Sequence, residues 1–226
     1  MKKTYHITYN ATYNDGDLMA DTSEFIDIIK TFHRTKVIED SKGTKAEKDF
    51  VWGSRKAAEK QAFSVLTRKW GEWSDMDLTI IIENVNWNGF DDKNKRFSIH
   101  FLTNLDRIGF IGIEQTREAL RILLDEEQDL DKRLNLAKAT YGSDAKGMFS
   151  SILYIFNSSR YAPLFKPIVR NLVRFDQIEG EPLKDTLSDY GRYCSMMKSF
   201  EKKYRIPPQL SDYVLSTWIN VWEKYR

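Results

Sequence analysis

The 226-residue chain has few of the residue types on which disulfide, zinc and nucleotide sites depend. Cys194 is the single cysteine, which excludes an intrachain disulfide and a zinc site built on cysteines. The 11 glycines are scattered, and none forms the Gly-rich loop that cradles phosphates. The sequence therefore argues against a stand-alone NTPase and favours a reducing, cytoplasmic environment.

Long apolar runs are also missing. The longest are of the kind LTIII at 78–82, against roughly 20 residues for a membrane-spanning helix. The N-terminus has two lysines but no apolar core of a signal peptide. His6, His33 and His100 show no i, i+4 pair and no HExxH motif. We expect no membrane association, no metal site and no cofactor.

The N-terminal half carries the signature of strands. Residues 4–13 alternate between two faces, as a half-buried strand does. Residues 35–52 read as a hairpin with Gly43 in its turn, and 77–87 with 96–103 as a second hairpin. Between the hairpins, Ser54 is a good N-cap for a helix. The first half is therefore predicted to be a β-rich α+β domain, residues 1–112.

The second half, residues 113–226, is predicted to be an all-helical domain. Apolar residues recur at helical spacing after residue 113, and Gly142 is a plausible C-cap. The stretch FSSILYIF at 149–156 is nearly all apolar and indicates a buried helix. The fold class is α+β: a β-hairpin and helix half followed by a helical half, with no flexible linker between them.

Positive charge is concentrated between residues 30 and 69, where eleven bases against five acids give an excess of six in a chain whose net charge is +2. Basic helices contact a phosphate backbone, and aromatic rings stack on unpaired bases. We expect Trp52, Trp73 and Trp87 to stack; the alternative is that tryptophans such as Trp52 and Trp70 belong to the core. The expected phosphate contacts are Arg55, Lys56, Lys60, Arg68 and Lys69.

A second basic run, KPIVRNLVR at 166–174, places Lys166, Arg170 and Arg174 at i, i+4 and i+8, on one face of a helix. Like charges in such a stripe repel each other, so an anionic partner would explain it. An internal salt-bridge network with acids such as those at 125–131 is the alternative. These three bases are further candidates for nucleic-acid binding.

The helical half resembles the N-terminal recognition regions of methyl-directed, McrBC-like restriction GTPases. In those regions an acidic D-E-x-x-L-x-x-R stretch precedes a buried helix, a tyrosine- and proline-containing phrase and a D-x-x-x-W helix. Asn157-Ser158-Ser159 replaces the usual Asn-Pro, and the Gly-x-Gly turn is reduced to Gly142 and Gly147. The matching residues here are Asp125, Glu126, Leu130, Arg133, Leu153, Tyr161, Pro163, Asp212 and Trp218.

This resemblance implies a part that recognises DNA, including modified DNA, while motor or nuclease subunits act elsewhere. The expected partner is therefore nucleic acid, DNA rather than RNA, and the expected function is non-enzymatic recognition in a restriction or defence system. A second hypothesis is a protein–protein adaptor or inhibitor, phage-encoded for instance, using exposed Trp218 and Trp222. A third is a metal-dependent nuclease built around Glu83, since carboxylates at strand ends can hold Mg²⁺.

Overall fold

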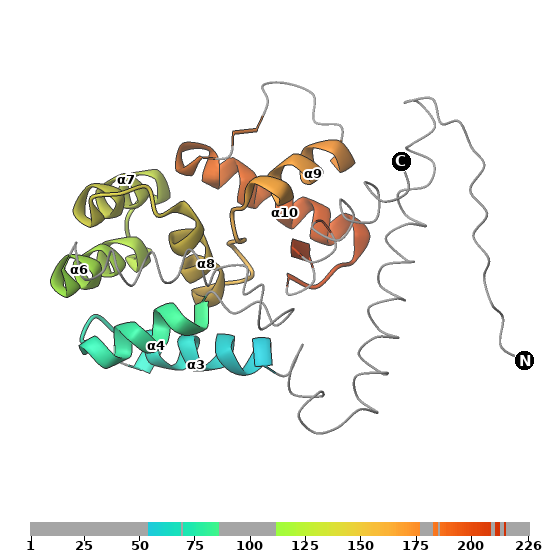
Figure 1. Cartoon of the computed structure of the whole chain (residues 1–226). Helices are drawn as coiled ribbons and strands as arrows, with labels where there is room; N and C mark the ends of the chain where they lie inside the picture. The colour runs from blue at the N-terminus through green and yellow to red at the C-terminus, as the bar shows by residue number, and fades with distance from the viewer. Residues whose placement is uncertain are drawn as a thin grey trace, which may run out of the picture.

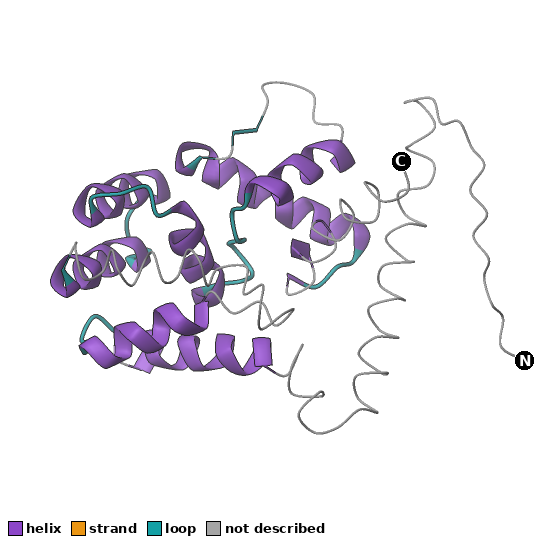
Figure 2. Cartoon of the chain, viewed as in Figure 1, coloured by secondary structure: helices purple, strands orange, loops and turns teal. Residues whose placement is uncertain are grey.

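The regular structure of the chain is helical wherever it is described. The computed structural model describes residues 54–68, 70–85, 112–176, 183–184, 186–208, 211–212 and 215. No strand occurs in these residues (Figure 2), so the predicted α+β class is wrong for this part, while the described elements of the second half are helical, as predicted. In chain order, the elements in Figure 1 are α3 (Ser54–Arg68), α4 (Asp75–Val85), α6 (Ile113–Leu124), α7 (Leu130–Tyr141), α8 (Lys146–Phe156), α9 (Lys166–Asp176), η3 (Leu187–Asp189) and α10 (Tyr190–Tyr204).

The clearest error concerns α4, which was expected to be the first strand of a hairpin. Its start is a reciprocal cap: the Ser74 backbone N–H donates to the Asp77 carboxylate at 2.9 Å, and the Asp77 N–H donates to the Ser74 hydroxyl at 3.3 Å. Leu78, Ile81 and Ile82 are then buried along one side of the helix. The other predicted strands, 4–13, 35–40, 48–52 and 96–103, lie outside the described residues.

The turn between α3 and α4 is fixed to α6 by two arginines. Trp73 is 1% exposed, and its indole N–H donates to the Val65 carbonyl at 3.3 Å. Arg117 Nε donates to the Trp73 carbonyl at 2.5 Å, and Arg121 Nε donates to the Gly71 carbonyl at 2.6 Å. These bonds satisfy backbone groups that no helix serves, and they hold the turn against α6.

Helices α6 and α7 form a hairpin across the short connection 125–129 and lie side by side in Figure 1. The Asp129 carboxylate caps α7 by accepting from the Asp131 and Lys132 backbone N–H groups at 3.0 and 3.2 Å. Gly142 ends α7 with φ 75°, the left-handed conformation that suits glycine. The C-cap predicted at Gly142 is therefore confirmed.

Helix α8 is the central element of the bundle. Its residues from Met148 to Tyr154 are all buried, which confirms the buried helix expected there. It contacts α3, α4 and α6. The segment 157–165 leaves α8 without regular structure, and it would be costly to bury if its polar backbone groups lacked partners.

Side chains provide those partners. The Leu164 N–H donates to the Ser150 hydroxyl at 2.8 Å. The Tyr190 hydroxyl donates to the Ala162 carbonyl at 2.9 Å, and the Tyr193 hydroxyl donates to the Pro163 carbonyl at 2.6 Å. The segment is thus held between α8 and α10.

One hydrophobic core includes buried residues of α3 and α4 as well as buried residues of α6 to α10. The predicted division into residues 1–112 and 113–226 stays a prediction, but the described helices on its two sides share this core. No helix in the described part of the chain combines the length and the apolar character needed to cross a membrane.

Candidate nucleic-acid interface

Helix α9 has the two-faced character that its sequence predicts. Ile168, Val169 and Leu172 are buried, and Lys166 and Arg170 are exposed. The apolar residues anchor the helix in the core, so its basic residues face away from it. Arg174 belongs to the same helix, but the structure does not describe its side chain.

Helix α10, which packs against α9, supplies a second basic face that was not predicted. Arg192, Lys202 and Lys203 are exposed, while Tyr193, Met197 and Phe200 are buried. Residues 192 and 203 are eleven positions apart, which is close to three helical turns. That spacing was readable in the sequence, where it could have shown that the bases share a face.

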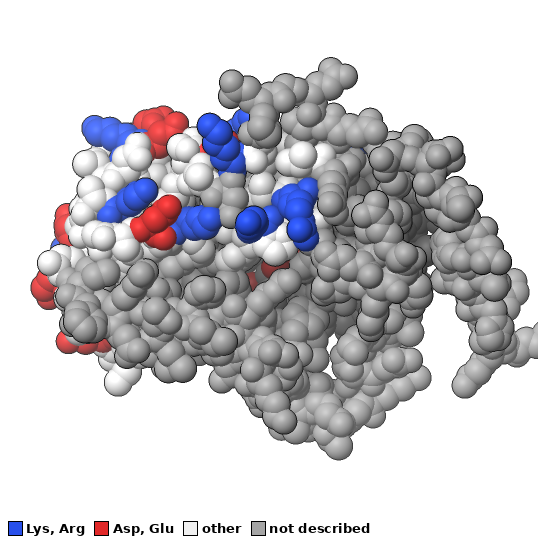
Figure 3. All heavy atoms as spheres, turned by 45° about the horizontal axis from the view of Figure 1, so that its top comes forward, with Lys and Arg blue, Asp and Glu red and all other residues white. Residues whose placement is uncertain are grey.

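The one acid of α10 does not pair with the exposed lysines Lys166 and Lys202. Glu201 is 7% exposed and is committed to an internal network, accepting from Lys198 Nζ at 2.8 Å and from the Ser211 hydroxyl at 2.8 Å. Lys166 and Lys202 form no ion pair within the described part of the chain. On the face of the molecule that Figure 3 brings forward, Lys and Arg are more prominent than Asp and Glu.

Negative charge gathers elsewhere, around α6 and the start of α7. Arg117 and Arg121 compensate part of this charge, through ion pairs with Glu114 and, at 3.3 Å, with Glu118. The acids of this region are Glu114, Glu118, Asp125, Glu126, Glu127, Asp129 and Asp131. Acids are therefore concentrated around α6 and the start of α7, whereas exposed bases outnumber exposed acids on the described parts of α9 and α10.

The N-terminal basic candidates lie apart from α9. Lys60 and Arg68 are exposed on α3; Arg55 and Lys56 belong to the start of that helix, without described side chains, and Lys69 lies outside the described residues. In Figure 1, α8 lies between α3 and the pair formed by α9 and α10. The described structure therefore does not bring the two predicted basic segments together.

The structure reverses the expected burial of two tryptophans, Trp70 and Trp73. Trp73, expected to stack on a base, is a core residue whose indole N–H already has a partner, so we leave it out of any binding surface. Trp70, considered a core residue of the preceding helix, is 46% exposed because α3 ends at Arg68. Trp52, Trp87, Trp218 and Trp222 lie outside the described residues.

The basis for a nuclease centred on Glu83 was its position near the end of a strand. Residue 83 lies in α4 instead, which removes that argument. Among the described residues, no three His, Cys, Asp or Glu side chains are grouped closely enough to hold a metal ion.

Cys194 is buried in α10 beside Tyr190. Burial raises the pKa of its thiol to about 11, and burial also raises the pKa of Tyr190 well above its usual value. Because the thiolate is the reactive form of cysteine, the thiol of Cys194 has the character of a structural residue.

Three residues that carry the resemblance to restriction proteins meet in the structure. Arg133 is fully buried and donates to the Leu123 carbonyl at 3.0 Å and to the Tyr161 hydroxyl. The Tyr161 hydroxyl donates in turn to the Glu126 carboxylate at 2.9 Å. The network joins the end of α6, the start of α7 and the segment after α8, so these residues organise the fold.

Comparisons with family models, with curated proteins and with solved structures found no match for this chain. The resemblance therefore remains a hypothesis based on the residues named above.

Proposed function

We propose that this protein binds nucleic acid, DNA in preference to RNA, through the exposed bases of α9 and α10. The observation that carries the proposal is the pair of packed helices whose exposed faces both present lysine and arginine, with Lys166 and Lys202 unpaired in the described part. A single-sign surface of this kind attracts a polyanion and repels other cations.

For Lys166, the internal salt-bridge network considered for the 166–174 stripe has weaker support. Lys166 has no acid within ion-pair distance among the described residues, and the one described acid on α10, Glu201, is buried against Lys198 and Ser211. Lys166 and Lys202, which pair with no acid among the described residues, keep their charge for a partner.

The resemblance to methyl-directed restriction proteins motivates a narrower proposal, a recognition component whose motor or nuclease partner is another chain or segment. This narrower proposal rests on the residues that carry the resemblance, of which Glu126, Arg133 and Tyr161 form one network that organises the fold. The proposal is tested by comparing duplexes with and without methylated cytosine: equal affinity for both would leave general DNA binding and remove the modification-specific role.

Salt titration of DNA binding is the main experiment. Affinity for a fluorescent duplex of about 20 base pairs is measured by anisotropy between about 50 and 300 mM salt. Each phosphate contact contributes about 0.9 to the slope of log K against log salt, so the double variant Lys166→Gln, Lys202→Gln should lower that slope by about 1.8.

Two further double variants make the result specific. Lys132→Gln with Lys138→Gln removes the same charge from exposed positions on α7 and should leave the slope nearly unchanged. Lys60→Gln with Arg68→Gln tests α3. A slope that falls with the α3 pair and not with the α9–α10 pair would place the interface on α3, and absence of binding at the lowest salt would refute nucleic-acid binding altogether.

A further inference from the structure

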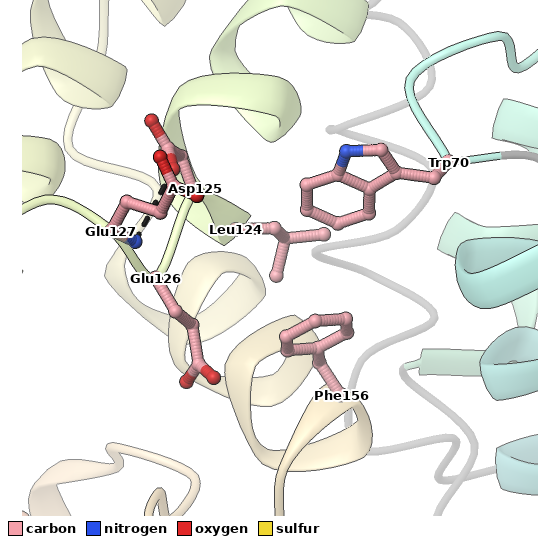
Figure 4. A pocket seen from close by; sticks show the side chains of 6 residues that line it. All are labelled: Trp70, Leu124, Asp125, Glu126, Glu127 and Phe156. Carbon is pink, nitrogen blue, oxygen red and sulfur yellow. Dashed lines mark hydrogen bonds between the residues drawn. The ribbon is translucent and has the colours of Figure 1, made fainter.

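A second surface, chemically opposite to the basic helices, lies where α6 and α8 end. Here Trp70, Leu124 and Phe156 and three carboxylates, of Asp125, Glu126 and Glu127, line an open cavity of about 420 Å³. Figure 4 shows the aromatic rings on one side and Asp125 and Glu127 on the other, with Leu124 between them. An aromatic wall facing carboxylates is a binding environment for an organic cation.

The aromatic wall of the cavity, formed by Trp70 and Phe156, is held by specific contacts. Trp70 stacks on Phe156 with 5.7 Å between ring centroids and meets Trp73 edge-on at 6.0 Å. The adjacent Gly71 has φ 74°, and a Cβ there would lie 3.4 Å from Arg121 Nε, the atom that donates to the Gly71 carbonyl. The turn therefore holds Trp70 in place although the side chain is 46% exposed.

The electrostatics of the cavity favour a cation from three sources. Leu124 and Phe156 are the last residues of α6 and α8, so two helix C-termini, each carrying a partial negative charge, meet at the cavity. Asp125 accepts from the Gln128 side-chain amide at 2.7 Å and stays half-buried. The exposed Glu127 carboxylate has no hydrogen bond or ion pair with the described residues.

One neighbouring cation, Arg160, already neutralises part of the negative charge of the three carboxylates. Arg160 lies 3.5 Å from Glu126 and 5.4 Å from the Tyr161 ring centroid, and the buried Arg133 reaches Glu126 only through the Tyr161 hydroxyl. Neither arginine lines the cavity. Asp125 and Glu127, on the side opposite Trp70, are therefore the carboxylates left to a ligand.

We propose that this cavity receives an arginine side chain from a basic segment of a partner protein. A guanidinium group can stack flat on an indole and donate several N–H bonds to carboxylates at once, which an ammonium group does less well. The carboxylates repel phosphate, so the occupant differs from that proposed for α9 and α10. This inference does not depend on nucleic-acid binding, because it involves other residues.

A peptide titration followed by NMR of the tryptophan indole N–H groups tests the proposal. The probe is a short peptide of alternating glycine and arginine, and the Trp70 signal is assigned from the variant Trp70→Phe. The arginine peptide should shift this signal, a lysine peptide should bind more weakly, and a peptide with neutral citrulline in place of arginine should leave it unmoved. Equal shifts with arginine and citrulline, or none at millimolar peptide, would overturn the proposal.

Variants separate a role of these residues in binding from one in folding. Glu127→Gln should weaken the arginine peptide about two- to fivefold, whereas Glu118→Gln, which removes the same charge about 9 Å back along α6, should not change it. Trp70→Phe keeps an aromatic ring for packing and should weaken binding about threefold. Unchanged binding in Glu127→Gln and Trp70→Phe would refute the assignment of the cavity. A Trp70 signal that moves with protein concentration alone would make a second copy of this chain the occupant and overturn the partner proposed.

Discussion

The hydroxyl of Tyr161 links two charges that do not meet directly, and removing it gives a sharp test of the buried network. Arg133 is fully buried, and its Nε has no hydrogen-bond partner in the described part of the structure. Its hydrogen bonds to the Leu123 carbonyl and to the Tyr161 hydroxyl therefore compensate most of its charge, and its cation–π contact with the Tyr161 ring, 5.6 Å from the centroid, would persist in a phenylalanine. Glu126 takes part only through that hydroxyl.

The substitution Tyr161→Phe keeps the ring and deletes the hydroxyl. Hydrogen bonds to charged groups contribute about 1.5–3 kcal/mol, and a buried charged group left without a partner is penalised at the upper end. We expect the free energy of unfolding to fall by about 2–3 kcal/mol. Tyr190→Phe is the matched control, because Tyr190 is also fully buried and its hydroxyl donates to a neutral carbonyl, that of Ala162; its expected cost is about 1 kcal/mol.

Urea unfolding followed by far-ultraviolet circular dichroism measures both costs, and equal slopes against urea would show that the variants unfold comparably. A double variant adds the decisive comparison. In the Arg133→Met background the Tyr161 hydroxyl no longer accepts a hydrogen bond from a buried charged group. Tyr161→Phe should then lower the free energy of unfolding by at least about 1 kcal/mol less than it does in the unsubstituted protein. Additive costs, or a Tyr161→Phe cost no larger than that of Tyr190→Phe, would refute the reasoning.

Two further predictions concern pH and backbone conformation. Burial raises the pKa of the Cys194 thiol from 9.0 to about 11. The neutral thiol therefore contributes stability that is complete below pH 9.0 and is lost as the pH rises to about 11, at about 1.4 kcal/mol per pH unit. The free energy of unfolding of the Cys194→Ala variant should fall less steeply at alkaline pH, and an equally steep fall would contradict this. Gly142→Ala should cost about 1 kcal/mol from the left-handed φ of 75° alone, since a Cβ there meets nothing within 4 Å. Gly191 lies in α10, and a Cβ there would lie 3.7 Å from Leu130 Cδ2, an ordinary contact. Gly191→Ala should therefore stabilise the protein by about 0.5 kcal/mol in thermal or urea unfolding. A change in the free energy of unfolding of the same sign at both glycines would refute the argument.

The helices that could be predicted from sequence are those whose apolar spacing and caps agree. In α6, α7 and α9 the buried positions recur at helical intervals, Gly142 marks the end of α7, and α8 is recognisable from its continuous apolar run. In α4 the signals conflict, because three consecutive isoleucines favour a strand while Ser74 and Asp77 form a helix cap. The spacing of Leu78, Ile81, Ile82 and Val85 fits a helix, and the cap decides between the two.

The candidate surfaces were less predictable, because they depend on contacts between distant residues. Which of Trp70 and Trp73 is buried depends on where α3 ends and on two α6 arginines more than forty residues further along the chain. No local pattern encodes that choice. The basic stripe of α9 was predictable since it lies within one helix, whereas its extension onto α10 required knowing that the two helices pack together.

The segment 157–165 connects the two proposed surfaces, the arginine cavity and the basic face of α9 and α10. It begins directly after Phe156, which lines the arginine cavity, and ends directly before Lys166, the first residue of α9. Its backbone is fixed by hydrogen bonds with Ser150, Tyr190 and Tyr193, and each bond to a buried group resists displacement by about 1 kcal/mol. A partner arginine at one end and a phosphate backbone at the other would therefore contact the same fixed framework. Binding at one surface changes affinity at the other only to the extent that this segment has a second arrangement to be selected. The side-chain bonds along it disfavour one, so we expect the two binding events to be independent.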